Sequence, residues 1–241
     1  MFSTAAYHTA LPGLPASSDL IAIAQWQFSR VFRSDLTAPG AALLSLGPGV
    51  SSAELRALMV GLKEALDGLY RRVTGRRLVY LSMGRFDQQT TTKFHLDGSP
   101  EEAYLMLGYE PTAVRSRVSI ADYTRAAHDW GIDPKALLSD FNPMYPGNER
   151  RLLPYVTELT AFDPAAAQIL LVNNGSRPYR PGSRHALGVM HQATIDTPLP
   201  AHRRVVNSTM IGSAADHEAE PVEQATQRLF VKTQAIAGEI G

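Results

Sequence analysis

The clearest hydrophobic pattern in the first third of the chain is that of an amphipathic helix. Ser51 and Glu54 form an S-x-x-E capping box, apolar residues then recur at helical spacing, and Gly75 offers a stop. We expect this helix to cover one face of a sheet. An apolar segment over residues 18–33 is also predicted to be helical, whereas residues 1–18 contain several Pro, Gly and Ser residues and are expected to form an irregular arm.

After Gly75 the pattern changes to short β-prone runs, most of which are separated by turn residues. These runs cover residues 78–83, 91–96, 104–109, 116–121, 168–172, 187–195 and 204–211. Helical segments are predicted near residues 123–130, 134–141 and 221–236. Helices followed by many short strands and a last helix predict an α+β fold, with the strands in a barrel or a jelly roll. Periodicity alone does not separate these two arrangements.

The length and composition are typical of one folded globular domain. The chain has 241 residues, of which 44% are hydrophobic and 19% are charged. We expect a mainly helical support, a β core and a C-terminal helix, over residues 1–77, 78–212 and 213–241 respectively. Oligomeric state cannot be read from these patterns.

Charge and cysteine content narrow the possible function classes. The chain has 23 basic and 23 acidic residues, so its formal net charge is zero, which argues against a nucleic-acid partner. It has no cysteine, so any metal must be held by His, Asp or Glu. The sequence shows neither a signal-peptide pattern nor an apolar stretch that could span a bilayer. We therefore expect no membrane partner and a cytoplasmic location.

Two short segments carry candidate metal ligands. His95 and Asp97 are two residues apart in a β-prone run, and residues at this spacing on a strand point to one face. This H-x-D pattern is short enough to occur by chance, as a strand-end histidine beside a turn aspartate. The second segment, residues 188–195, is β-prone and contains His191. Two histidines and one carboxylate form a facial triad, the ligand set of non-haem iron(II) oxygenases.

Arg203 and Arg204 begin the β-prone run that follows His191 and a turn. Antiparallel pairing of the two runs would bring an arginine close to His191. The open coordination positions of a facial triad suit a bidentate 2-oxo acid and dioxygen, and an arginine can bind the distal carboxylate of that acid through two hydrogen bonds. Adjacent strand residues face opposite ways, so only one of the two arginines can face inward, and spacing from His191 slightly favours Arg203.

This order of residues resembles the iron(II)/2-oxoglutarate-dependent dioxygenase superfamily. The resemblance covers roughly residues 78–212 and implies a double-stranded β-helix, which is a distorted, cupin-like jelly roll with helices on one side. It implies that His95, Asp97 and His191 bind Fe(II), and that one of the two arginines binds 2-oxoglutarate as co-substrate. The implied reaction uses dioxygen to decarboxylate 2-oxoglutarate and to oxidise, typically hydroxylate, a second substrate.

Other features leave alternatives open. Tyr109 could hydrogen-bond the co-substrate or could simply be a core residue. Neutral charge favours a small-molecule substrate, such as an amino acid or another polar metabolite, over a polymer. The same three ligands could instead hold zinc in a hydrolase, although no H-E-x-x-H motif is present. In a third alternative the chain is a non-catalytic jelly-roll binding module, with His95 and His191 as ordinary strand residues.

Several polar residues are interpreted first as structural. Residues 173–175, Asn-Asn-Gly, are typical of a turn. His185 and His202 are expected in loops, and His128 and Trp130 on a helical insertion that is either a lid or ordinary packing. The arginines beside predicted strands are explained by surface ion pairs more readily than by an anionic substrate; these are Arg85, Arg115 and Arg117.

Overall fold

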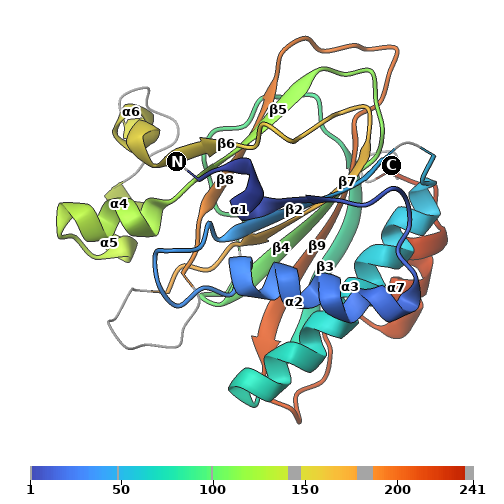
Figure 1. Ribbon diagram of the computed structural model, residues 1–241, viewed down its shortest axis with the longest axis horizontal. Coiled ribbons are helices and arrows are strands. Elements are labelled where there is room, and N and C mark those ends of the chain that lie inside the picture. Colours follow the sequence, from blue (N-terminus) through green and yellow to red (C-terminus); the bar gives the residue numbers. More distant parts are fainter. Residues whose placement is uncertain (1, 48, 99, 141–147, 178–186, 237–241) are drawn as a thin grey trace.

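The computed structural model describes residues 2–47, 49–98, 100–140, 148–177 and 187–236 (Figure 1). These residues form a mixed α/β structure with a six-stranded sheet and a three-stranded sheet, called here the large and the small sheet. The helices are α1 (Thr4–Tyr7), η1 (Ser17–Asp19), α2 (Leu20–Val31), α3 (Ser52–Thr74), α4 (Tyr123–Trp130), α5 (Pro134–Asp140), α6 (Asn148–Leu152), η2 (Leu153–Tyr155) and α7 (Gln224–Lys232). The strands are β1 (His8–Ala10), β2 (Ala41–Gly47), β3 (Arg77–Asp87), β4 (Ala103–Tyr109), β5 (Ser116–Ala121), β6 (Val156–Glu158), β7 (Ala167–Asn173), β8 (Met190–Ile195) and β9 (Val205–Ala214).

Helix α3 begins and ends where the sequence predicts. The Ser51 hydroxyl accepts a hydrogen bond from the Glu54 backbone N–H, and the Ser51 N–H donates to the Glu54 carboxylate at 2.9 Å. Gly75 ends the helix in the left-handed conformation, with φ of 70°, which glycine adopts without a steric penalty. The apolar face of α3 packs on the large sheet together with α2 and α7. The prediction of an amphipathic helix that covers a sheet is therefore confirmed.

The two sheets are stacked as layers, with helices on the outer face of the large one. The large sheet has the strand order β1-β2-β7-β4-β9-β3, and the small sheet has the order β6-β5-β8. Only the pairing of β1 with β2 is parallel among the described strands. Side chains of β4 alternate between the two faces of the large sheet. Tyr104 and Met106 pack on the helix side, and Leu105 and Leu107 pack on the side of the small sheet. The described strands do not close into a barrel.

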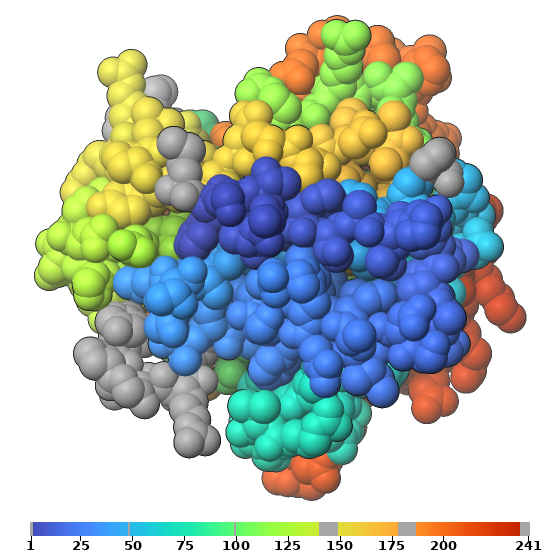
Figure 2. Space-filling view, viewed as in Figure 1, coloured from blue at the N-terminus to red at the C-terminus, as the bar shows by residue number. Residues whose placement is uncertain are grey.

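The N-terminal third contributes more to the sheet than its sequence indicates. Residues 1–77 were predicted to be mainly helical, yet β2 lies inside the large sheet, between β1 and β7. Five of the seven residues of β2 are buried and its two faces are both covered, so its sequence is mostly apolar and lacks strand alternation. The expected irregular arm also contains α1 and β1, and this segment crosses the middle of the face shown in Figure 2.

The segment that carries the H-x-D pattern is not a regular strand, contrary to prediction. Residues 91–96 touch β8 through a hydrogen bond from Thr92 N–H to the Ala193 carbonyl and an isolated bridge between His95 and His191. Between these contacts the chain bends, because Phe94 packs into an apolar cluster with α4 and the His95 ring lies 2.7 Å from the Lys93 carbonyl oxygen. The hydrogen-bond ladder between residues 91–96 and β8 is therefore interrupted.

No helix in the described part of the chain is long and apolar enough to cross a bilayer.

The backbone of Gly188, just before β8, packs closely against the backbone of Gly175. A Cβ added at Gly188 would lie 1.9 Å from the Gly175 carbonyl oxygen, and 2.9 Å from its carbon. Both atoms belong to the backbone, so neither can move out of the way as the end of a flexible side chain could.

Gly188→Ala is accordingly expected to lower the free energy of unfolding by about 2–4 kcal/mol, because the added methyl group forces two backbone segments apart. Urea unfolding followed by circular dichroism measures the effect. Gly13→Ala is the matched control, since a Cβ at Gly13 meets no atom within 4 Å. Equal stability of the two variants would contradict the close backbone packing.

Candidate metal centre

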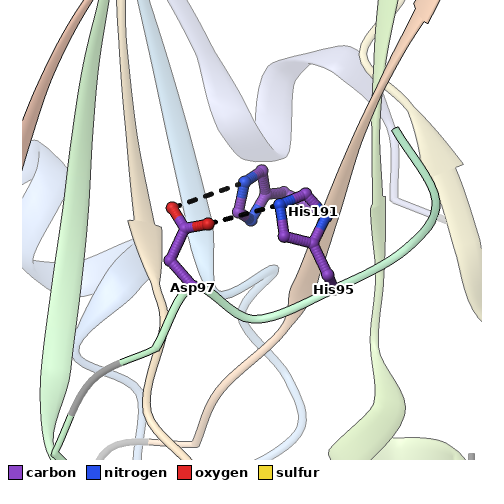
Figure 3. A group of neighbouring side chains, drawn as sticks. All are labelled: His95, Asp97 and His191. Atoms are coloured by element: carbon purple, nitrogen blue, oxygen red, sulfur yellow. Dashed lines mark ion pairs between the residues drawn. The ribbon is translucent and has the colours of Figure 1, made fainter. Parts of the chain in front are cut away.

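Three side chains with metal-binding atoms converge on one point between the sheets. His191 comes from β8, whereas His95 and Asp97 come from the segment between β3 and β4. Their ligand atoms all lie within 4.8 Å of one another. The Nε2 atoms of His95 and His191 lie 3.3 and 3.9 Å from the two carboxylate oxygens of Asp97 (Figure 3). The structure thus brings together the three residues that the sequence proposed as ligands.

The two histidines are held side by side by their own backbones. The His95 N–H donates to the His191 carbonyl at 3.2 Å, and the His191 N–H donates to the His95 carbonyl at 3.1 Å. Residues paired in this way carry adjacent side chains on the same face, and the two ring centroids are 4.3 Å apart. The position of one histidine therefore determines that of the other.

The ring of His95 is oriented as a ligand would be. Its Nδ1 lies 2.7 Å from the Lys93 carbonyl oxygen, which can only accept, so Nδ1 carries the proton. The lone pair of Nε2 then points toward Asp97, as in metal sites where a backbone carbonyl fixes the tautomer. Three acceptor atoms consequently face one another, and such a group needs either a proton or a cation among them.

The ionisation of the three groups is shifted by this crowding. The hydrogen bond to Asp97 raises the pKa of His95, against the opposing effect of burial. Burial and the neighbouring His95 lower the pKa of His191 to about 4. Burial acts to raise the pKa of Asp97, but the hydrogen bond from His95 and the nearby histidine charges outweigh it and lower the pKa. Close packing of the three groups therefore favours a proton on His95 over one on His191.

The three residues line a cavity of about 530 Å³ that extends between the two sheets. Its floor is buried and largely apolar, and it is formed by Leu105, Leu107 and Tyr109 of β4 with Val206 and Met210 of β9. Phe86, Gln88 and Thr92 also line it, and the ring of Phe86 is 45% exposed. The three candidate ligands thus face a partly open cavity that is large enough for small organic molecules.

Arg204, and not Arg203, points between the sheets. Arg204 is 1% exposed, whereas Arg203 is on the surface, contrary to the slight preference that spacing gave Arg203. The Arg204 Nε donates to the Ser116 hydroxyl at 3.0 Å, and its guanidinium carbon lies 5.3 Å from the ring centroid of Tyr109. Arg204 Nη1 also donates to the Gln88 carbonyl and side-chain oxygens, at 3.2 and 3.0 Å.

The Asp87 carboxylate bonds to the backbone of Arg204, whose N–H donates to it at 3.0 Å, and not to the guanidinium. The side chain of Arg204 forms no salt bridge with the described residues, and its buried Nη2 has no hydrogen-bond partner among them. Burial lowers the pKa of Arg204 from its usual value, although Tyr109 and Asp87 oppose this. A buried cation without a salt bridge is costly, and an anionic ligand would reduce that cost. Tyr109 both lines the cavity and packs edge-on against Phe162, so it is a core residue that also faces the cavity.

The remaining candidate residues lie elsewhere. Arg117 forms exposed ion pairs with Asp196 and Glu158, as a surface interpretation predicts. Arg85 differs, because it is buried on the helix side of the large sheet, opposite the cavity-lining Phe86 and Val206. His128 and His202 are exposed, and His185 lies outside the described residues.

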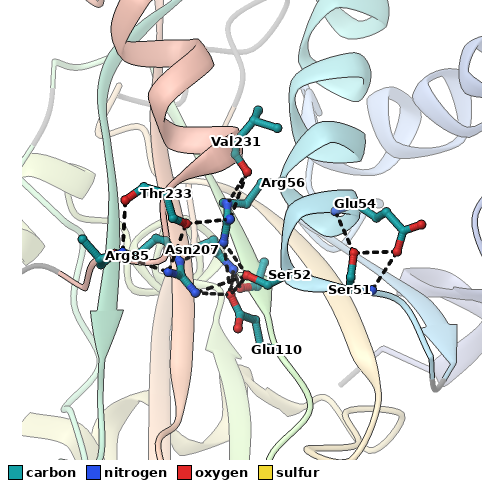
Figure 4. Close-up of polar contacts among 11 residues, drawn as sticks. Ser51, Ser52, Glu54, Arg56, Arg85, Glu110, Asn207, Val231 and Thr233 are labelled. Carbon is teal, nitrogen blue, oxygen red and sulfur yellow. Dashed lines mark hydrogen bonds and ion pairs between the residues drawn. The ribbon is translucent and has the colours of Figure 1, made fainter.

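Arg85 belongs to a buried polar network that holds the end of α7 (Figure 4). It donates to the Glu110 carboxylate at 2.8 Å and to the Asn207 side chain at 3.0 Å. Arg56 joins Glu110 at 3.4 Å and donates to the Thr233 carbonyl at 2.8 Å. Cations at the carbonyl end of a helix are favourable, so this network is a structural anchor behind the cavity.

Three residues that contact the candidate site residues escaped the sequence analysis. Ser116 and Gln88 bind Arg204, and the Asn174 side chain bonds to the backbone of Asp97. The Asn-Asn-Gly pattern at residues 173–175 indicated only a turn, and no local signal marks a side chain whose partner lies 77 residues away.

A scan against protein-family models finds no match for this chain, and a search of curated proteins finds none either. Evidence for function therefore comes from the chemistry and geometry of the site.

Proposed function

We propose that this protein is an iron(II)- and 2-oxoglutarate-dependent dioxygenase that oxidises a small molecule. One observation carries the proposal: a His–Asp–His cluster lines the inter-sheet cavity, and the buried Arg204 contacts Tyr109 and Gln88, which line the same cavity. The first matches the ligand set of non-haem iron(II) oxygenases, and the second suits a dicarboxylic co-substrate.

The path of the chain supports a double-stranded β-helix, or jelly roll. From β3 onward the chain alternates between layers: β3 is in the large sheet, residues 92–95 touch the small sheet, β4 returns to the large sheet, and β5 and β6 form part of the small one. Strands β7, β8 and β9 then alternate again. Eight segments in two facing sheets, which alternate except at the paired β5 and β6, are the pattern expected of a jelly roll.

The donor set fits iron(II). Two imidazole nitrogens and one carboxylate oxygen would hold the ion, and all three residues line the cavity in which a substrate would bind. When bound, iron(II) supplies activation of dioxygen, coupled to oxidative decarboxylation of the co-substrate. The role of His95, Asp97 and His191 is to hold the ion, and the apolar floor of the cavity offers a non-polar surface to the substrate beside it.

Arg204 is the proposed binding residue for the distal carboxylate of 2-oxoglutarate. The guanidinium is already fixed by Ser116 and Gln88, so little conformational freedom is lost when an anion binds. Tyr109 lies against the guanidinium on the cavity side and is proposed to contact the same co-substrate.

An anaerobic titration tests the proposal. Iron(II) added to the metal-free protein with 2-oxoglutarate should produce a weak visible charge-transfer band, which should be absent when either component is omitted. Zinc binding without any response to 2-oxoglutarate would favour a hydrolase that uses the same ligands. Binding of neither metal would leave a non-catalytic binding module.

Metal affinity of the site is expected to rise with pH from about pH 6 up to the raised pKa of His95. Both imidazoles must be neutral to bind an ion, and the pKa of His191, about 4, leaves that ring neutral throughout this range. His95 has a pKa above its ordinary value of 6.5, so a proton must leave it for each ion bound. Affinity should therefore fall about tenfold per pH unit below the pKa of His95. Calorimetric titration with cobalt(II) at three pH values measures this, and a constant affinity would contradict it.

A further inference from the structure

Asp97 is the proposed ligand with the least support from its own segment. His95 and His191 hold each other through paired backbone hydrogen bonds, and β8 is in turn paired with β5. Asp97 lies beyond that bridge, outside any strand, and its side chain is 40% exposed. Some other group must therefore fix where its carboxylate points.

Asn174 provides that support from the large sheet. Its side-chain Nδ2 donates to the Asp97 carbonyl at 2.9 Å, and its Oδ1 accepts from the Asp97 N–H at 3.0 Å. The amide thus binds the N–H and the C=O of one residue, as a neighbouring residue does in an antiparallel hydrogen-bonded pair. A side chain takes the place of a strand at this point.

Asn174 is itself firmly placed. It directly follows β7, is 0% exposed, and donates its backbone N–H to the Ala103 carbonyl at the start of β4. Its Nδ2 also lies 3.9 Å from the sulfur of Met210, a residue of the cavity floor. The amide consequently connects the rigid large sheet to the one ligand that the small sheet does not hold.

We propose that Asn174 is a positioning residue for the metal centre, which sets the carboxylate of Asp97 relative to the two histidines. This inference rests on the proposed metal site. With the amide in place, Asp97 is ordered before an ion arrives, whereas without it the ion must order the segment on binding. Loss of groups that orient metal ligands typically lowers metal affinity about 10- to 100-fold.

The experiment compares Asn174→Ala with Asn173→Ala in the full chain. Asn173 is the matched control: it is the adjacent residue of the same type, is 1% exposed, and bonds to the Val31 carbonyl and the Gly175 N–H instead of Asp97. Cobalt(II) affinity is measured by titration, and thermal unfolding is followed with and without cobalt(II). Both variants should lower the melting temperature of the metal-free protein, because each removes buried hydrogen bonds.

Only Asn174→Ala should weaken cobalt(II) binding, by about 10- to 100-fold, and reduce the rise in melting temperature that cobalt(II) produces. A merely structural role would lower both melting temperatures and leave the affinity and the cobalt-induced rise at wild-type values. Equal losses of affinity in the two variants would likewise overturn the inference.

Asn174→Asp is the second variant, for use if the alanine variant does not fold. A carboxylate keeps the acceptor for the Asp97 N–H but loses the donor to the Asp97 carbonyl, with little change of shape. It should also weaken cobalt(II) binding, and wild-type affinity would overturn the inference. If the wild-type protein itself fails to bind cobalt(II), the metal centre is refuted, which is distinguishable from failure of the Asn174 role alone.

Discussion

His95→Ala and Asp97→Ala are each expected to abolish iron-dependent decarboxylation of 2-oxoglutarate while leaving the protein folded. A facial triad that loses one of its three ligands no longer holds the ion in the required geometry. The side chains are 31% and 40% exposed, so their removal takes little from the core. The free energy of unfolding of the metal-free protein should change by about 1 kcal/mol or less.

The measurement is succinate formation under aerobic conditions with iron(II) and 2-oxoglutarate, beside urea unfolding of each metal-free variant. His128→Ala is the matched control for His95→Ala, because His128 is an exposed histidine that lies beside an aspartate on α4. The control should retain the wild-type rate. Full activity in either ligand variant would show that the ion is held elsewhere or is not required.

Arg204→Met is expected to raise the 2-oxoglutarate concentration needed for half-maximal turnover by roughly ten- to a hundredfold. A charge-assisted pair to a carboxylate contributes about 1.5–3 kcal/mol, which corresponds to that range. Replacement of Arg204 removes a buried charge that has no salt bridge to the described residues, but it also leaves the acceptors on Ser116 and Gln88 without their donor, so the two effects on stability oppose each other. The metal-free variant should therefore be nearly as stable as the wild type.

Arg204→Lys separates charge from shape. Lysine keeps the positive charge but cannot bind a carboxylate through a planar fork, nor reproduce the bonds to Ser116 and Gln88. Its affinity for 2-oxoglutarate should fall, though less than that of the methionine variant.

Arg203→Met and Arg203→Lys are the matched controls and should leave the affinity unchanged, because Arg203 lies on the surface. Affinities for 2-oxoglutarate are measured by titrating the co-substrate in the turnover assay. Four unchanged affinities would mean that the co-substrate binds elsewhere or is not used.

Interactions between residues close in sequence allowed several helices and strands to be predicted from the sequence alone. Helix α3 is specified by a capping box, a helical apolar stripe and a terminal glycine, all of which act within a few residues of one another. Strand β5 occupies residues 116–121 as predicted, because its alternation of buried and exposed positions matches the period of a strand. The H-x-D pattern also lies within one short segment, so His95 and Asp97 could be proposed as neighbours without a tertiary structure.

Features that depend on pairing between distant segments were decided only by the fold. Strand β2 is buried on both faces, and its uniform apolar sequence lacks the alternation by which half-buried strands are recognised. Which arginine faces inward follows from the register of β9 against its neighbours, and a shift of one residue would exchange Arg203 and Arg204.

The geometry of the site itself belongs to this second group. His191 lies beside His95 because two backbone segments far apart in sequence exchange hydrogen bonds, and Asn174 meets Asp97 because the large sheet brings it there. The sequence by itself determined which residue types could bind a metal, through their side-chain chemistry. Only the tertiary structure decided which of them meet, since long-range hydrogen bonds and strand register are properties of the packed chain and leave no local periodic signal.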